Sequence, residues 1–118
     1  MITKEITLDG NEFTIGMSAL IPRFYRKQFK HDLVTDMHSL SAAYQKATKE
    51  GREIPPEMME ILENVAWVSL KHGGSEVGSS PEEWLETLGD PFCVYALLPV
   101  IIDMWAANNK TTSVPRKK

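Results

Sequence analysis

Hydrophobic and polar residues alternate along the beginning of the chain. Residues 2–8 and 12–16 both show this period of two, which is typical of β-strands with one buried face. The tripeptide Asp9-Gly10-Asn11 lies between them, and its glycine tolerates the positive φ of a tight turn. The pattern therefore predicts an N-terminal β-hairpin. Because an isolated hairpin is only marginally stable in water, we expect its apolar face to pack on helices.

After the hairpin, hydrophobic residues recur every three or four positions, which predicts helices. Polar caps, first-turn prolines and terminal glycines mark where these helices begin and end. The predicted helices cover residues 18–30, 32–50, 55–72, 81–88 and 91–107. The expected fold is α+β, mainly α-helical with about five helices and an N-terminal β-hairpin. At 118 residues the chain has room for one domain, predicted over residues 1–108, with a flexible basic tail over residues 109–118.

The last predicted helix differs from the others because apolar side chains cover all of its sides. Between Phe92 and Ala107 it carries a single charged residue, Asp103. Such a helix must be surrounded by other elements, by a membrane or by a partner. A membrane is a poor explanation, because the run is shorter than the roughly 20 residues of a span and contains Pro99 and Asp103. Enclosure within the domain and partial exposure to a partner both stay open, and Pro99 predicts a kink or a local opening.

Large apolar side chains in and near this helix are candidates for contacts with a partner. Trp67 is predicted to lie on a polar helix face, where it is either covered by a neighbouring segment or open as a binding anchor. Methionine adapts to irregular apolar surfaces, and tryptophan presents a large rigid one. The candidate hydrophobic contact residues are Trp67, Trp84, Ile101, Met104 and Trp105.

Charge is unevenly distributed, although the chain as a whole carries only −3. Residues 1–50 hold seven basic and six acidic side chains, residues 51–105 hold two basic and ten acidic, and the remaining residues hold four basic. An acidic body with basic ends suits head-to-tail contacts between copies, whereas simple solvation of both faces is the alternative. Such contacts are heterologous and produce rings or open spirals. The candidate self-association residues are the cations Arg23, Arg26, Lys27 and Lys30 and the carboxylates Glu57, Glu60 and Glu63.

No residues in the sequence have the spacing of a catalytic or metal site. The histidines do not form a metal-binding pair on one helix face, and His72 is better placed to interact with a helix C-terminus. The glycine-rich residues 73–78 follow a helix and lack the Gly-Lys-Ser/Thr ending of a phosphate loop. Cys93 lies in an apolar segment, which favours a buried side chain that fills space in the core. It is the single cysteine of the chain, which is typical of proteins in a reducing compartment. We therefore expect a non-enzyme without cofactor or metal, without a secretory signal, in the cytoplasm.

Three segments, together with the hairpin and the helix order, resemble a known family. They are Ile15–Phe29, Asn64–Gly73 with its pattern of apolar-Ala-Trp followed by Lys-His-Gly, and Ser80–Leu85. Over roughly residues 4–107 the chain resembles the small tail assembly chaperones of long-tailed phages and prophages of Gram-positive bacteria.

The resemblance implies a non-catalytic factor that acts in the host bacterial cytoplasm and leaves the finished virion. Members coat the hydrophobic tape-measure protein, recruit tail-tube (major tail) subunits and form homo-oligomers. The implied partners are thus the tape-measure protein, the tail-tube protein and further copies of the chain, with no nucleic acid and no membrane. A longer form made by ribosomal frameshifting is typical of the family.

Two other functions remain as alternatives. The basic stripe beside Phe24, Tyr25 and Phe29 is compatible with a small nucleic-acid-binding regulator, although the acidic middle of the chain would repel phosphates. The second alternative is a structural connector subunit that stays in the virion.

Overall fold

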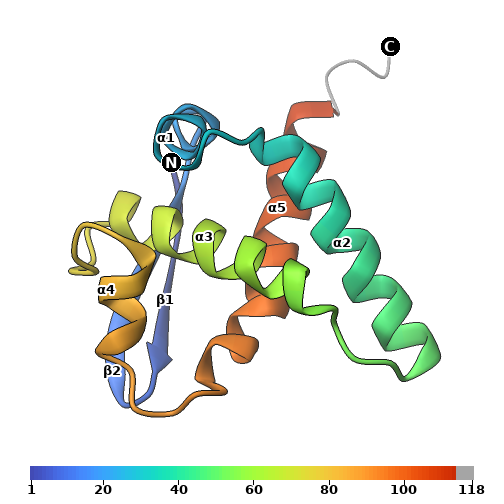
Figure 1. Cartoon of the computed structure of the whole chain (residues 1–118). Helices are drawn as coiled ribbons and strands as arrows, with labels where there is room; N and C mark the ends of the chain where they lie inside the picture. Colours follow the sequence, from blue (N-terminus) through green and yellow to red (C-terminus); the bar gives the residue numbers. More distant parts are fainter. Residues whose placement is uncertain (114–118) are drawn as a thin grey trace.

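The computed structural model describes the backbone of residues 1–113 and the side chains of residues 1–106. Within this part the fold is α+β and mainly helical, with five α-helices and an N-terminal antiparallel hairpin (Figure 1). The elements are β1 (Ile2–Leu8), β2 (Asn11–Met17), α1 (Ile21–Phe29), α2 (Leu33–Glu50), α3 (Pro56–His72), α4 (Pro81–Glu86), the short 3-10 helix η1 (Cys93–Ala96) and α5 (Leu97–Ser113).

The predicted hairpin is confirmed, but its loop is one residue shorter than the predicted tripeptide turn. The register pairs Leu8 with Asn11, so the loop consists of Asp9 and Gly10, both with positive φ (55° and 80°). Those angles match the turns whose twist suits a two-residue hairpin. The Asp9 carboxylate also accepts a hydrogen bond of 2.7 Å from the backbone N–H of Gly89, which ties the turn to the segment after α4.

Helix α3 passes through the middle of the molecule and packs on β2 and on α1, α2, α4 and α5 (Figure 1). All six consecutive residues from Val65 to Leu70 are buried, so in this stretch burial extends around every side of α3. The sequence pattern assigned that property to the last helix instead. In α5, Leu97, Leu98 and Ile101 are buried, but Pro99 is exposed.

The C-terminal end of α3 lies directly on β2. A Cβ atom at Gly73 would collide with the carbonyl oxygen of Thr14, so only glycine permits this approach. The next turn supplies Ser75, whose Oγ accepts a hydrogen bond of 2.8 Å from the N–H of Thr14 and donates one of 3.0 Å to its carbonyl oxygen. The hydroxyl therefore satisfies a backbone edge of β2 that the hairpin leaves unpaired.

Helix α1 is shorter than the predicted helix over residues 18–30. It begins at Ile21, so Pro22 lies in the first turn, the position where the sequence requires it. The preceding Ser18 instead accepts a hydrogen bond of 3.2 Å from the N–H of Leu20 through its Oγ. The helix ends because Lys30 adopts the left-handed conformation with φ 61°, which side-chain periodicity does not reveal.

The predicted continuous helix over residues 91–107 is wrong at both ends. Residues Cys93–Ala96 form η1, and the α-helix begins only at Leu97. Proline lacks an N–H and would clash with the carbonyl of Tyr95, so the α-helix begins where Pro99 falls in its first turn. At its other end α5 continues to Ser113. The prediction stopped at Ala107 because the residues that follow it are polar and show no apolar pattern. Of the predicted flexible tail, residues 114–118 lie outside the described residues.

Candidate interaction surfaces

Four of the five candidate hydrophobic contact residues are buried in the core. Trp67, Trp84, Ile101 and Met104 belong to one cluster of buried side chains, so in this conformation they pack inside the molecule. Trp105 is the exception, because it is partly exposed on α5. The structure therefore does not bring these residues together as one surface.

Trp67 is covered by a neighbouring segment, which was one of the two interpretations open for it. Its indole Nε1 donates a hydrogen bond of 3.0 Å to the carbonyl oxygen of Val77, in the loop after α3. The ring of Phe29 packs edge-on against it with centroids 6.0 Å apart, and Lys71 Nζ lies 5.4 Å from its centroid. Trp67 thus joins α1 and α3 to this loop.

Trp105 lies in an apolar groove of about 200 Å³ between the start of α2, the start of α1 and α5. None of its described lining residues is charged. We call it the Trp105 groove, and its lining includes Met17, Ala19, Pro22, Val34, Met37 and Trp105. Val34 at the rim is 43% exposed and nearby Leu20 is 49% exposed, so apolar surface continues from the groove to the outside.

The four candidate cations, three on α1 and Lys30 directly after it, are all exposed, and among the described residues no carboxylate lies within 4.0 Å of them. One of them, Lys27, lines a groove of about 480 Å³ that lies between α1 and the C-terminal half of α3. We call it the cationic groove. Its lining contains no acidic residue and consists of Phe24, Lys27, Gln28, Trp67, Val68, Lys71 and His72.

The three candidate carboxylates face two different neighbours. Glu57 and Glu60 are exposed and line a pocket with Tyr25 and Phe29, so they lie beside the end of α1 in the same molecule. Glu63 faces the other way, towards α4 and the segment before α5. Burial raises the pKa of Glu63, and the nearby carboxylates of Glu60 and Glu82 raise it further.

An exposed aromatic pair at η1 was missed by the sequence reasoning. Phe92 is 70% exposed and Tyr95 is 46% exposed, and their ring centroids lie 6.3 Å apart. They border a depression of about 280 Å³ whose other lining includes Met59, Leu85, Leu88, Glu63 and Asp90. We call these two rings the aromatic patch. Pro99 was the available signal, because a proline is tolerated only in the first turn of an α-helix, and a helix that begins just before Pro99 leaves Phe92 and Tyr95 outside the regular helical pattern.

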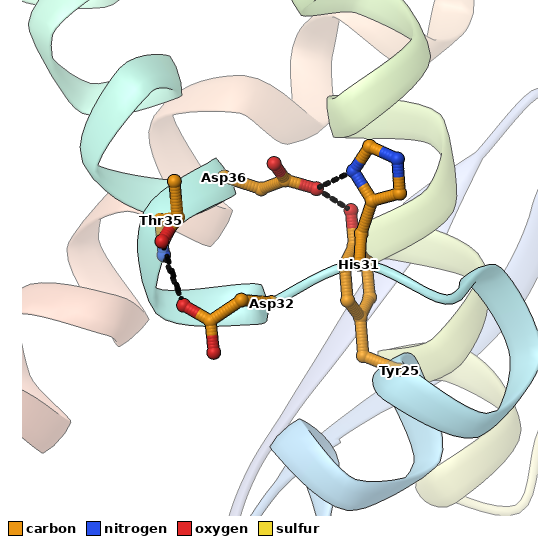
Figure 2. Close-up of polar contacts among 5 residues, drawn as sticks. All are labelled: Tyr25, His31, Asp32, Thr35 and Asp36. Carbon is orange, nitrogen blue, oxygen red and sulfur yellow. Dashed lines mark hydrogen bonds and ion pairs between the residues drawn. The ribbon is translucent and has the colours of Figure 1, made fainter.

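A polar cluster joins α1 to the start of α2. The phenolic hydroxyl of Tyr25 donates a hydrogen bond of 2.7 Å to Oδ2 of Asp36, and Nδ1 of His31 lies 3.4 Å from the same oxygen (Figure 2). Asp32 caps α2 by accepting hydrogen bonds from the N–H and the hydroxyl of Thr35, which lower its pKa. Burial and the bond to Asp36 raise the pKa of Tyr25 far above its ordinary value, so the phenol stays neutral and acts as a donor. The cluster is suited to joining helices, and it contains no activated nucleophile.

The remaining chemistry candidates are weak. Burial raises the pKa of the Cys93 thiol, as do Asp9 and Asp90, which disfavours the reactive thiolate. Among the described residues, no group of three or more His, Cys, Asp or Glu side chains is arranged to hold a metal ion. No helix in the described part of the chain has the length and apolar character needed to cross a membrane. Comparison with family models, with curated proteins and with solved structures finds no match to this chain.

Proposed function

We propose that this chain is a non-catalytic phage tail assembly chaperone. It oligomerises in the host cytoplasm, binds apolar segments of the tape-measure protein, recruits tail-tube subunits and leaves before the virion is complete. The observation that carries the proposal is the Trp105 groove, an uncharged depression whose apolar lining continues to exposed Val34 and Leu20.

An uncharged groove with apolar walls favours one class of ligand. Apolar side chains gain about 25 cal/mol for each Å² removed from water, and nothing in the described lining supplies the charge that a polar ligand would need. The partly exposed Trp105 offers a large rigid surface, and the buried Met17 and Met37 behind the groove are flexible side chains that tolerate small changes in its shape. Such a groove binds hydrophobic segments with little dependence on their exact sequence, which suits a long client with many similar segments.

Co-expression with the tape-measure protein of the same phage or prophage tests the client. We expect the wild-type chain to keep that protein in the soluble fraction after centrifugation. Val34→Glu places a charge at the rim of the groove without entering the core, and should abolish this effect. Ala42→Glu is the matched control, because Ala42 is exposed on the same helix and does not line the groove. Equal solubility of the client with and without the chain would contradict the proposal.

Purified virions separate a chaperone from a connector. A chaperone should be absent from them by immunoblot although it is abundant in the lysate. Stoichiometric recovery of the chain in the particles would instead identify a structural subunit.

The exposed cations of α1 favour a second candidate, a nucleic-acid-binding regulator. Charge-driven binding is strongest at low ionic strength, so electrophoretic mobility of duplex DNA at about 50 mM salt is the discriminating measurement. An unshifted DNA band at micromolar protein excludes this candidate, whereas a shift that disappears in Arg23→Glu supports it.

A further inference from the structure

The cationic groove and the aromatic patch are both exposed, and the Trp105 groove involves neither of them. We propose that the aromatic patch of one copy docks into the cationic groove of the next copy. The inference deepens the self-association included in the proposed function by naming its two surfaces.

The cationic groove is built to take an apolar or aromatic group beside a carboxylate. Its base is apolar, because it consists of the buried side chains of Trp67 and Val68, and Phe24 forms an exposed aromatic wall. Its positive charges lie at the rim. Lys71 Nζ is positioned over Trp67 and donates a hydrogen bond of 3.3 Å to the carbonyl oxygen of Gly78.

The wall of the groove is also held in place. His72 Nε2 and Ser18 Oγ are hydrogen-bonded at 2.9 Å, and the ring of Phe24 packs against the imidazole with centroids 5.5 Å apart. Lys27, from α1, stands on the same side as Phe24 and carries a charge that no described carboxylate neutralises. A ligand that enters therefore meets a preformed site, which reduces the entropy lost on binding.

The aromatic patch has the complementary chemistry. Phe92 and Tyr95 project from η1, and the carboxylates of Asp90 and Glu63 lie beside them. The Asp90 carboxylate accepts a hydrogen bond of 2.9 Å from the N–H of Phe92, which orders the turn that presents the ring. Docking would place an aromatic side chain of the patch against Phe24. It would also bring the carboxylates beside the patch near Lys27 and Lys71, so apolar and ionic contacts would form together.

The positions of the two surfaces determine the kind of assembly. The cationic groove involves α1, at the top of Figure 1, whereas the segment of the aromatic patch lies at the bottom of the same view. A copy that docks through its patch therefore keeps its own groove free for a third copy. Such a heterologous contact adds copies in series, into a ring or an open spiral.

The sequence had paired the basic stripe with Glu57, Glu60 and Glu63 of the next copy. Glu57 and Glu60 border α1 of their own molecule, but Glu63 lies beside the aromatic patch. The new contact thus keeps Lys27 and Glu63 from the earlier pairing and adds the two aromatic rings. Docking of the rings buries apolar surface, which contacts between exposed ion pairs do not.

Two single variants test the contact. Lys27→Glu reverses a charge in the groove and leaves the patch intact, and Phe92→Ser removes the exposed ring and leaves the groove intact. Sedimentation velocity should show that the average mass of the wild type rises with concentration and falls with added salt. Each variant alone should associate about tenfold or more weakly than the wild type.

The mixture of the two variants is the sharpest measurement. The Phe92→Ser chain still has a groove and the Lys27→Glu chain still has a patch, so an equimolar mixture should form a heterodimer and nothing larger. Lys49→Glu and Ile2→Ser are matched controls, because both residues are exposed and lie outside the two surfaces and outside the Trp105 groove. Both controls should associate like the wild type, and circular dichroism should show that all four variants are folded.

Several outcomes would overturn the inference: a wild type that stays monomeric at high concentration, variants that associate as well as the wild type, or a mixture that stays monomeric while the wild type associates. Binding of DNA that Lys27→Glu abolishes would assign the groove to nucleic acid and would overturn it too. A monomeric chain that still keeps the tape-measure protein soluble would refute this contact and leave the client binding intact. Oligomers that form through this contact but do not keep the client soluble would support the contact and contradict the proposed client binding.

Discussion

The hydroxyl of Tyr25 and the carboxylate of Asp36 form a hydrogen bond of 2.7 Å that joins α1 to α2 across the turn between them. Both side chains are buried, and Figure 2 shows that His31 approaches the same carboxylate oxygen. This bond links α1 to α2, and α1 carries one side of the cationic groove.

Removal of the Tyr25 hydroxyl should destabilise the protein. In Tyr25→Phe the buried carboxylate of Asp36 loses its closest donor, which costs about 1–3 kcal/mol of unfolding free energy. Urea unfolding at pH 7 measures this difference. Tyr44→Phe is the matched control, because Tyr44 lies on α2 without a hydrogen bond from its hydroxyl to any described residue, and it should change stability by less than about 0.5 kcal/mol. Equal losses in the two variants would contradict the role of the bond.

The same pair makes the unfolding free energy depend on pH in the alkaline range. Burial, then the hydrogen bond to Asp36, then the charges of Asp36 and Glu60 raise the pKa of Tyr25. Because the folded-state pKa lies above the unfolded one, the contribution is fully present below the ordinary tyrosine value of about 10 and is lost as the pH rises above it. The unfolding free energy of the wild type should therefore fall more steeply above pH 10 than that of Tyr25→Phe. Parallel curves would show that the phenol ionises equally in both states.

Substitution of Gly73 tests the contact between α3 and β2. In Gly73→Ala the new methyl group would collide with the Thr14 carbonyl, and since backbone must move to admit it, we expect a loss of about 1–3 kcal/mol. Gly89→Ala is the control, since a Cβ there would meet only the Asp9 carboxylate at an ordinary 3.6 Å. Thermal unfolding should separate the two variants clearly. A neutral Gly73→Ala would mean that the end of α3 can move away from the hairpin at little cost.

Ser69 offers a stabilising change. Its hydroxyl is fully buried in α3 and has no hydrogen-bond partner among the described residues. Ser69→Ala removes that unsatisfied group and should raise the unfolding free energy by about 1 kcal/mol or more. Ser39→Ala on the exposed face of α2 gains only the better helix propensity of alanine, at most about 0.5 kcal/mol. If the two serines gave equal gains, burial of the Ser69 hydroxyl would not be the cause.

Local patterns were sufficient where neighbours along the chain define the structure. The alternation of residues 2–8 and the Asp9-Gly10 turn specify the hairpin, because its register depends only on the turn and on the buried face. Asp32 begins α2 and Gly51 ends it, and both act through bonds to residues three or four positions away.

The candidate site was less accessible to sequence reasoning. The exposed cations of α1 follow from helical spacing, and Lys27 does line a groove. The other side of that groove comes from α3, more than thirty residues away, and no local pattern indicates which helix lies opposite. The aromatic patch was missed for a local reason, because η1 turns Phe92 and Tyr95 outward from the helix in which periodicity had placed them.

The sequence by itself determined the composition of the fold: a hairpin, helices with defined caps, an acidic middle and an excess of apolar side chains. Only the tertiary structure decided which of those side chains are hidden. Trp67 is buried because the loop after α3 folds back over it, and Ser75 attaches that loop to Thr14, sixty-one residues earlier. Burial depends on such distant pairings, whereas the period of a helix reports only which residues share a face. For the same reason α3, and not the last helix, became the element that the rest of the chain surrounds.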